Sequence, residues 1–295
     1  MLGSAFIETY GRKGYIAWEA AALELARAGR LTPWPWVDLH LTDGVNTAVL
    51  KVASDVLSVG PFEDYVRLPL TPNMAQSILN LSGALLTTPW LEYQIYRAAP
   101  AKLMPTPMVP NKGADLEHYA AHSRLIDAEL APLNAAPSVL RTGHKKGVVI
   151  GNLFKPGHVL IFGWYGPPPR PDVFDDHRPM GLSDRQPRQP YSNLHGDYYI
   201  DYSHGIRAVG PVAVVNGQPM ATAALYAHPT LSKLVSHEGP LKVVRYPSRV
   251  PVATDPPAAV TSRARLWPLP SYDAPLSHSM TEWGLETIAR QWTGR

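Results

Sequence analysis

The densest group of chemically reactive side chains lies between His195 and Arg207, where histidines, aspartates, a serine and an arginine alternate with tyrosines. If this segment is an extended strand, every second side chain points to the same face of a sheet. Burying unpaired charges costs several kcal/mol, so a face of this kind is either exposed to solvent or part of a functional site. We expect a site with five catalytic candidates: His195, Asp197, Asp201, Ser203 and His204.

Three kinds of hydrolytic chemistry fit these residue types. A zinc ion held by His195, Asp201 and His204, with His144 as an optional further ligand, would polarise a scissile carbonyl and activate water. Alternatively, Ser203 is a nucleophile with His195 or His144 as its base. Paired carboxylates for glycosidic chemistry are less favoured, because Asp197 and Asp201 would lie about 13 Å apart on a strand. A solvent-exposed edge strand without any chemistry is the structural alternative.

A basic turn at Arg141–Lys146 precedes an apolar run and is the second candidate. If it folds beside the first segment, its lysines would hold an anionic group or an oxyanion. We therefore expect a substrate-binding set made of His144, Lys145, Lys146, Trp164, Tyr198 and Arg207. His118 and His122 have helical zinc-site spacing, but no third ligand is near them in the sequence, so a solvated or core role is favoured.

The composition excludes several classes of protein. The 295 residues include no cysteine, which removes thiolate catalysis, cysteine-ligated zinc and disulfides. The net charge is only +3 and the basic residues are scattered, so nucleic-acid binding is not indicated. We see no signal peptide and no apolar run of membrane-spanning length. Compartment and oligomeric state are left open, and a phage-encoded protein or one exported by another route would fit equally.

The sequence predicts a mainly helical first half of the chain. Helix spacing and capping residues predict helices over 15–28, 71–86, 90–98 and 115–130, and we expect the second and third to pack as a pair. Strands are expected over 47–57 and 65–68, followed by an extended crossing segment over 100–110.

From about residue 143 the pattern changes to short β-branched and aromatic runs, with the clearest hairpin signal at Asn216-Gly217. Long proline-rich loops are expected over 166–190 and 249–275, and a terminal helix over 280–292. We expect an α+β fold with a helical N-terminal half packed on a mainly antiparallel, loop-rich β C-terminal half. It would form a single domain over 1–295, helix-rich in 1–135, strand-rich in 143–222, and with proline-rich loops and the C-terminal helix in 240–295.

The motifs GHKKGVVIGN and HGDYYIDYSHGIR, together with EDYVRLPLTPNMAQSILNLSGALLTTPWLEYQIYRAA, are similar to a group of little-characterised bacterial and phage proteins with a GHKK-type turn and an H-x-D-x-Y-x-D-Y-S-H-G segment. Members of this group are sometimes joined to peptidoglycan-binding modules, which implies a cell-wall setting. We therefore expect a hydrolase acting on peptidoglycan or a similar extracellular polymer. The alternative is a non-catalytic phage structural or wall-binding protein.

Overall fold

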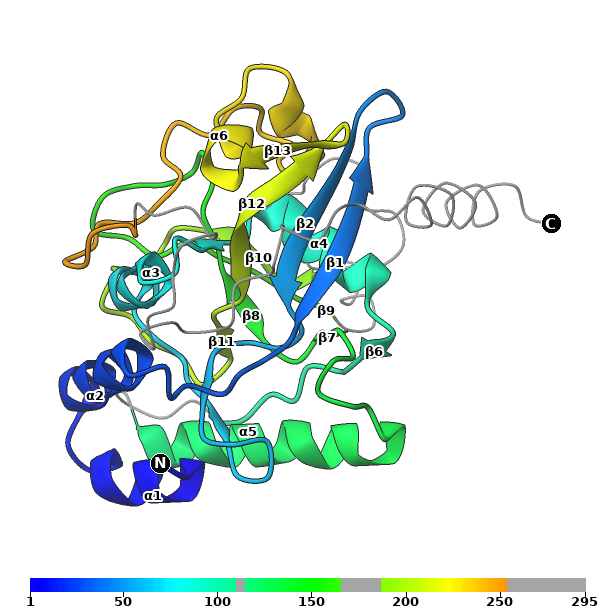
Figure 1. Ribbon diagram of the computed structural model, residues 1–295. Helices are drawn as coiled ribbons and strands as arrows, with labels where there is room; N and C mark the ends of the chain where they lie inside the picture. The colour runs from blue at the N-terminus through cyan, green and yellow to red at the C-terminus, as the bar shows by residue number, and fades with distance from the viewer. Residues whose placement is uncertain (110–114, 166–186, 254–295) are drawn as a thin grey trace, which may run out of the picture.

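The computed structural model describes residues 1–109, 115–165 and 187–253. The chain folds into helices and antiparallel-rich sheets, an α+β arrangement (Figure 1). The helices are α1 (Gly3–Tyr10), α2 (Tyr15–Arg27), α3 (Pro72–Asn80), α4 (Pro89–Ala98), α5 (Leu116–Leu130) and α6 (Thr222–Tyr226), with short 3₁₀ turns at Ala131–Leu133 and Leu231–Leu234.

The largest sheet combines strands from both ends of the chain. Its order is β1 (Trp36–Thr42), β2 (Thr47–Ala53), β12 (Ala208–Val215) and β13 (Gln218–Ala221), and β5 (Leu85–Leu86) also pairs with β12. All of these pairings are antiparallel. Because the β1–β2 hairpin belongs to the N-terminal part of the chain, the expected division into a helical half and a strand half is not clearly confirmed.

The second sheet carries the residues of interest. Its order is β10 (Pro187–Ser192), β9 (Ile161–Tyr165), β8 (Lys146–Val148) and β11 (His204–Gly205). The β8–β11 pair is parallel and aligns His204 with Lys146. Two small two-stranded sheets complete the set: antiparallel β3 (Ser58–Val59) with β4 (Val66–Arg67), and parallel β6 (Ala101–Lys102) with β7 (Arg141–Thr142).

Local capping signals explain where several helices begin. The side chain of Thr88 accepts a hydrogen bond from the Leu91 amide at 3.1 Å, and Asp115 accepts one from the Glu117 amide at 2.9 Å. Both are N-cap bonds that satisfy amides with no partner inside the helix. The Asn216-Gly217 hairpin is also confirmed, with positive φ at both residues as a tight β-hairpin turn requires.

Two expectations about the helices are wrong. Helix α3 ends at Asn80 instead of continuing to 86, because the chain turns through Gly83 at φ +70 and then enters β5. Helices α3 and α4 also do not form a packed pair: α3 lies mainly against α2, and α4 against β9. The intervening strand β5 joins the large sheet and separates them.

The core is a continuous cluster of buried side chains that extends from Phe6 to Tyr246 and lies between the sheets and helices. Helix α5 runs along one side of the molecule, where it contacts α1 and β4 (Figure 1). In the part of the chain that is described, no helix combines the length and apolarity needed to cross a bilayer. The expected terminal helix over 280–292, loop residues 166–186 and the greater part of the 249–275 loop lie outside the described residues.

Candidate functional site

The segment from His195 to Arg207 is not a continuous strand, which corrects the sequence-based expectation. Only His204 and Gly205 are in a strand, and backbone hydrogen bonds close two turns before it. These run from the Tyr199 amide to the Gly196 carbonyl and from the His204 amide to the Asp201 carbonyl, both at 3.0 Å. Because the turns break the two-residue alternation, His195, Asp197, Asp201 and Ser203 do not share one sheet face as they would in a continuous strand.

The turns place the two ends of the segment at different depths. His195 is exposed, and its ring stacks on Tyr199 with 4.0 Å between the ring centroids. Ser203 and His204 are completely buried, at 0% exposure. The segment therefore leads from the surface at His195 to the interior at His204.

His204 is the most unusual residue of the segment. Within residues 1–109, 115–165 and 187–253, neither of its ring nitrogens has a hydrogen-bond partner, and the hydroxyl of neighbouring Ser203 has none either. Burial lowers the pKa of His204 below its ordinary value, with the nearby Lys146 and Lys145 ammonium groups acting in the same direction and Asp201 opposing them. The imidazole is therefore neutral at physiological pH, with one nitrogen able to accept a proton.

Asp201 is half-buried and receives three hydrogen bonds. Its carboxylate accepts hydrogen bonds from Lys146 Nζ at 3.1 Å, from the Ser203 amide at 3.1 Å and from the Tyr199 hydroxyl at 3.4 Å. Burial opposes ionisation, but His204, the Lys146 ammonium and the hydrogen bonds from Lys146 and the Ser203 amide together lower the pKa of Asp201. The Tyr199 ring also meets the His204 ring edge-on, with 5.5 Å between centroids. We call Tyr199, Asp201, Ser203, His204 and Lys146 the His204 centre.

Trp164 borders the His204 centre. The Lys146 ammonium lies 5.0 Å from its ring centroid and the Arg188 guanidinium 5.8 Å, both within cation–π range. Its backbone has a φ of +59, which is strained for a residue with a bulky side chain. The expected aromatic wall thus lies beside the lysine that holds Asp201.

Lys145, in the bend just before β8, contacts other groups than Lys146 does. Its ammonium donates to the Tyr202 carbonyl at 2.5 Å and to His122 Nδ1 at 2.9 Å. His122 Nε2 lies 3.1 Å from the Thr106 carbonyl and so carries the ring proton. Burial and nearby positive charge, chiefly Arg67, lower the pKa of Lys145 to about 7. Burial and Lys145 lower that of His122 to about 2.

The two basic residues of the turn thus contact the 195–207 segment at two points, Tyr202 and Asp201. His118 and His122 meet the ring of Tyr202 edge-on, with centroid distances of 5.2 and 4.8 Å. Both histidines therefore pack against this tyrosine, and His122 serves as the acceptor for Lys145.

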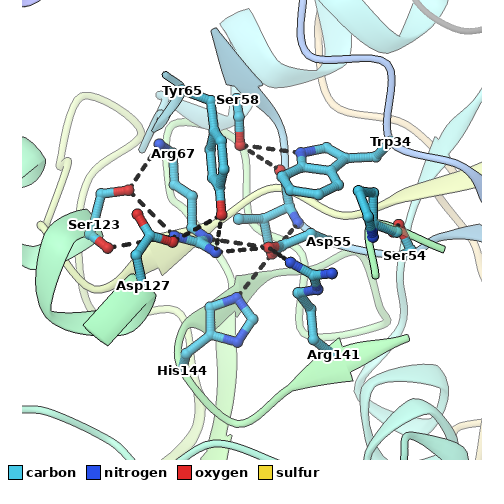
Figure 2. A network of polar contacts seen from close by, with 12 residues as sticks. Trp34, Ser54, Asp55, Ser58, Tyr65, Arg67, Ser123, Asp127, Arg141 and His144 are labelled. Atoms are coloured by element: carbon cyan, nitrogen blue, oxygen red, sulfur yellow. Dashed lines mark hydrogen bonds and ion pairs between the residues drawn. The ribbon is translucent and has the colours of Figure 1, made fainter. Parts of the chain in front are cut away.

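His144 belongs to a separate buried network, shown in Figure 2. Its Nε2 lies 2.9 Å from Asp55 Oδ1, and the same carboxylate accepts from Arg67 Nη2 at 2.9 Å. Arg67 also donates through Nη1 to Asp127 at 2.7 Å and through Nη2 to the Tyr65 hydroxyl at 2.9 Å. We call these five residues the Arg67 network.

The remaining candidates lie apart from the His204 centre. Asp197 accepts a hydrogen bond from the Asn73 amide group at 2.8 Å, and Tyr198 is 72% exposed. Arg207 is buried and donates to the carbonyls of Ala53 and Arg141, at 2.6 and 2.7 Å. Its guanidinium therefore fastens two backbone segments together.

The proposed zinc ligands are not gathered. In residues 1–109, 115–165 and 187–253, no three side chains of the types that bind metals form a group able to hold an ion. His195 stacks at the surface, whereas His204 is buried behind Tyr199. The geometry of the described residues gives the zinc mechanism no support.

Apart from His144, no residue of the Arg67 network is among those that the sequence predicted for a site. Asp55 and Arg67 each interrupt an apolar run, VASDVLSVG and YVRLPL, and both are completely buried. A lone charge inside a strand-like apolar run was the available signal, because such a charge needs a buried partner. Comparison of the chain with protein-family models, curated proteins and solved structures found no match.

Proposed function

We propose that the protein is a hydrolase that acts on bacterial peptidoglycan or a similar extracellular polymer through the His204 centre. The observation that carries the proposal is a set of buried atoms that find no hydrogen-bond partner among the described residues, namely Ser203 Oγ and both ring nitrogens of His204. Leaving a buried polar group unsatisfied costs about 1–3 kcal/mol. A buried group of this kind calls for an explanation, and use by a ligand, a water molecule or a reaction is one.

Buried His204 is the candidate general base, although burial lowers its pKa and so weakens it as a base in the resting protein. Its free nitrogen would take a proton from an attacking water or hydroxyl group, and the nearby Asp201 carboxylate would stabilise the imidazolium that forms. Ser203 precedes His204 directly in the chain, and consecutive side chains diverge at the start of a strand. This favours water activated by His204 over attack by Ser203. Lys146, whose ammonium donates to Asp201, is the cation of the centre that would stabilise negative charge in the transition state.

The substrate class rests on the sequence resemblance and on the surface near the centre. Tyr198 is 72% exposed, and the exposed ring of His195 stacks on the half-buried ring of Tyr199. Flat aromatic faces with polar edges suit contact with amphipathic polymers. The modest net charge of +3 is compatible with an anionic wall.

The test is the release of soluble fragments from purified peptidoglycan, measured as new reducing ends and new amino groups so that either kind of bond cleavage is detected. We expect release by the intact protein, loss in His204→Gln, and no loss in the control His40→Ala, which alters an exposed histidine. Thermal unfolding of each variant shows whether it is folded. Failure of the intact protein to release any fragment, or full activity of folded His204→Gln, would reject the proposal. Inhibition by chelator would restore the zinc mechanism.

A non-catalytic wall-binding protein is the second candidate, and the complete burial of Ser203 and His204 favours it. Only His195 and Tyr198 of the segment are freely exposed. In this case the protein would sediment with insoluble peptidoglycan without releasing fragments. Tyr198→Ala would weaken that binding, whereas His204→Gln would leave it unchanged.

A further inference from the structure

A cavity of about 500 Å³ lies outside the His204 centre, against the Arg67 network. It is bordered by the turn before β4, by the last residues of α5 and by the loop that leads to β7. None of its lining residues comes from the 195–207 segment. Its volume is within the range of pockets that hold small molecules. The lining residues used in the argument are Phe62, Glu63, Tyr65, Asp127, Ala131 and Arg141.

Asp127 is the polar group that the cavity leaves open. Its Oδ1 accepts from Arg67 Nη1 and from the Tyr65 hydroxyl, both at 2.7 Å. These two bonds fix the orientation of the carboxylate, as Figure 2 shows. The side chain is 38% exposed, and no hydrogen bond to its Oδ2 is found among the described residues. A fixed carboxylate oxygen therefore faces the cavity and is available to a ligand.

Arg141 is the positively charged residue that lines the cavity, and its guanidinium is held by protein groups. Its guanidinium donates to the carbonyls of Ala135 and Ala136 at 3.3 and 2.7 Å, and lies over the Trp34 ring at 5.1 Å. Its side chain is only 5% exposed and lies 3.9 Å from Asp55. These contacts leave little of its charge for a ligand.

The other charged groups at the cavity are acidic. Glu63 is exposed, and Asp64 accepts two hydrogen bonds from Ser4, at 2.9 and 2.5 Å. Half-buried Phe62 and Tyr65 supply aromatic surface next to them. Negative charge combined with aromatic faces attracts a cation and the apolar chain attached to it.

We propose that this cavity binds a small ligand carrying a primary ammonium group. The ammonium donates to Asp127 Oδ2, and the apolar part of the ligand packs against Phe62. A charge-assisted hydrogen bond of this kind is stronger than a neutral one and selects an ammonium over a hydroxyl. The site is independent of the proposed hydrolase, because it shares no residue with the His204 centre.

The experiment is a titration of the isotopically labelled full chain with n-butylammonium, followed by backbone amide shifts. We expect saturable shifts confined to residues 62–65 and 127–141. n-Butanol and butyrate, which keep the apolar chain but lack the ammonium, should bind at least about tenfold more weakly. Equal binding of butyrate, or shifts spread over the whole surface, would overturn the proposal.

Two variants test the proposed binding of the ammonium at Asp127, one by removing the charge and one by filling the cavity. Asp127→Asn removes the charge and should weaken n-butylammonium binding about tenfold or more. Because Asp127 also holds Arg67, Ala131→Trp provides a second test, since it fills the cavity from an exposed position and leaves the Arg67 network untouched. Asp38→Asn, in a surface ion pair on β1, is the matched control and should bind normally. Unchanged affinity in both cavity variants would refute the site.

Discussion

Replacing Lys145 by methionine should remove a pH dependence of folding that the native lysine creates. The pKa of Lys145 falls from 10.5 to about 7 because burial penalises its charge, and Arg67 adds repulsion. The unfolded chain therefore holds a proton between pH 7 and 10.5 that the native state gives up. Since the unfolded state binds more protons in this window, native stability rises with pH. Between pH 7 and pH 9 this gain is about 2 kcal/mol.

The assay is urea unfolding of the wild type and Lys145→Met at pH 7 and pH 9, followed by tryptophan fluorescence. The variant also leaves the Tyr202 carbonyl and His122 without their donor, but that cost is the same at both pH values. We therefore expect the stability difference to shift by about 2 kcal/mol in favour of the wild type as the pH rises. Lys155→Met, at an exposed lysine, should show no such shift. A difference that is equal at both pH values, or that moves the other way, would show that folding does not displace the Lys145 proton.

Three further substitutions test other parts of the structure. Burial raises the pKa of Glu19 from 4.5 to about 7, so its stabilising effect is complete below pH 4.5 and is lost as the pH rises through 7. Urea unfolding should show Glu19→Gln gaining about 3 kcal/mol on the wild type between pH 4.5 and 8. Asp55→Asn, which breaks the Arg67 network, should cost about 3–5 kcal/mol in the same assay, whereas Asp38→Asn at the surface should cost less than about 1 kcal/mol. Gly143→Ala should lower the melting temperature strongly, because its φ is +92 and an added Cβ would lie 2.0 Å from a backbone oxygen. Gly157→Ala, at φ +75 in open space, should cost only about 1 kcal/mol. Similar losses of stability in Asp55→Asn and Asp38→Asn, or in Gly143→Ala and Gly157→Ala, would contradict the environments assigned to these residues.

Elements with local signals could be predicted from the sequence. Thr88-Pro89 and Asp115 fix helix starts within a few residues, and Asn216-Gly217 fixes a hairpin by its positive φ angles. These features depend on side chains that bond to their own neighbouring backbone. No distant part of the chain is needed to form them.

Features that depend on distant partners could not be predicted in this way. The segment after His195 has the composition of a strand, but two turns form within it, and only His204-Gly205 pairs with a strand, β8. The pairing of Asp55 with Arg67 and His144 joins three separate stretches of sequence. The spacing of residues along the chain does not reveal which distant side chains will meet. The lone charges of Asp55 and Arg67 inside apolar runs did indicate that each needs a buried partner.

The position of β12 has a consequence for synthesis of the protein. β12 pairs with β2, so that Val52 lies opposite Val209, and the N-terminal hairpin lacks its inner neighbour until the ribosome has made most of the chain. During that interval the open edge of β2 presents unpaired backbone groups that recruit other strands. Long-range pairing of this kind also slows folding. A chain that ends before residue 208 would therefore leave this edge of β2 unpaired and open to other strands.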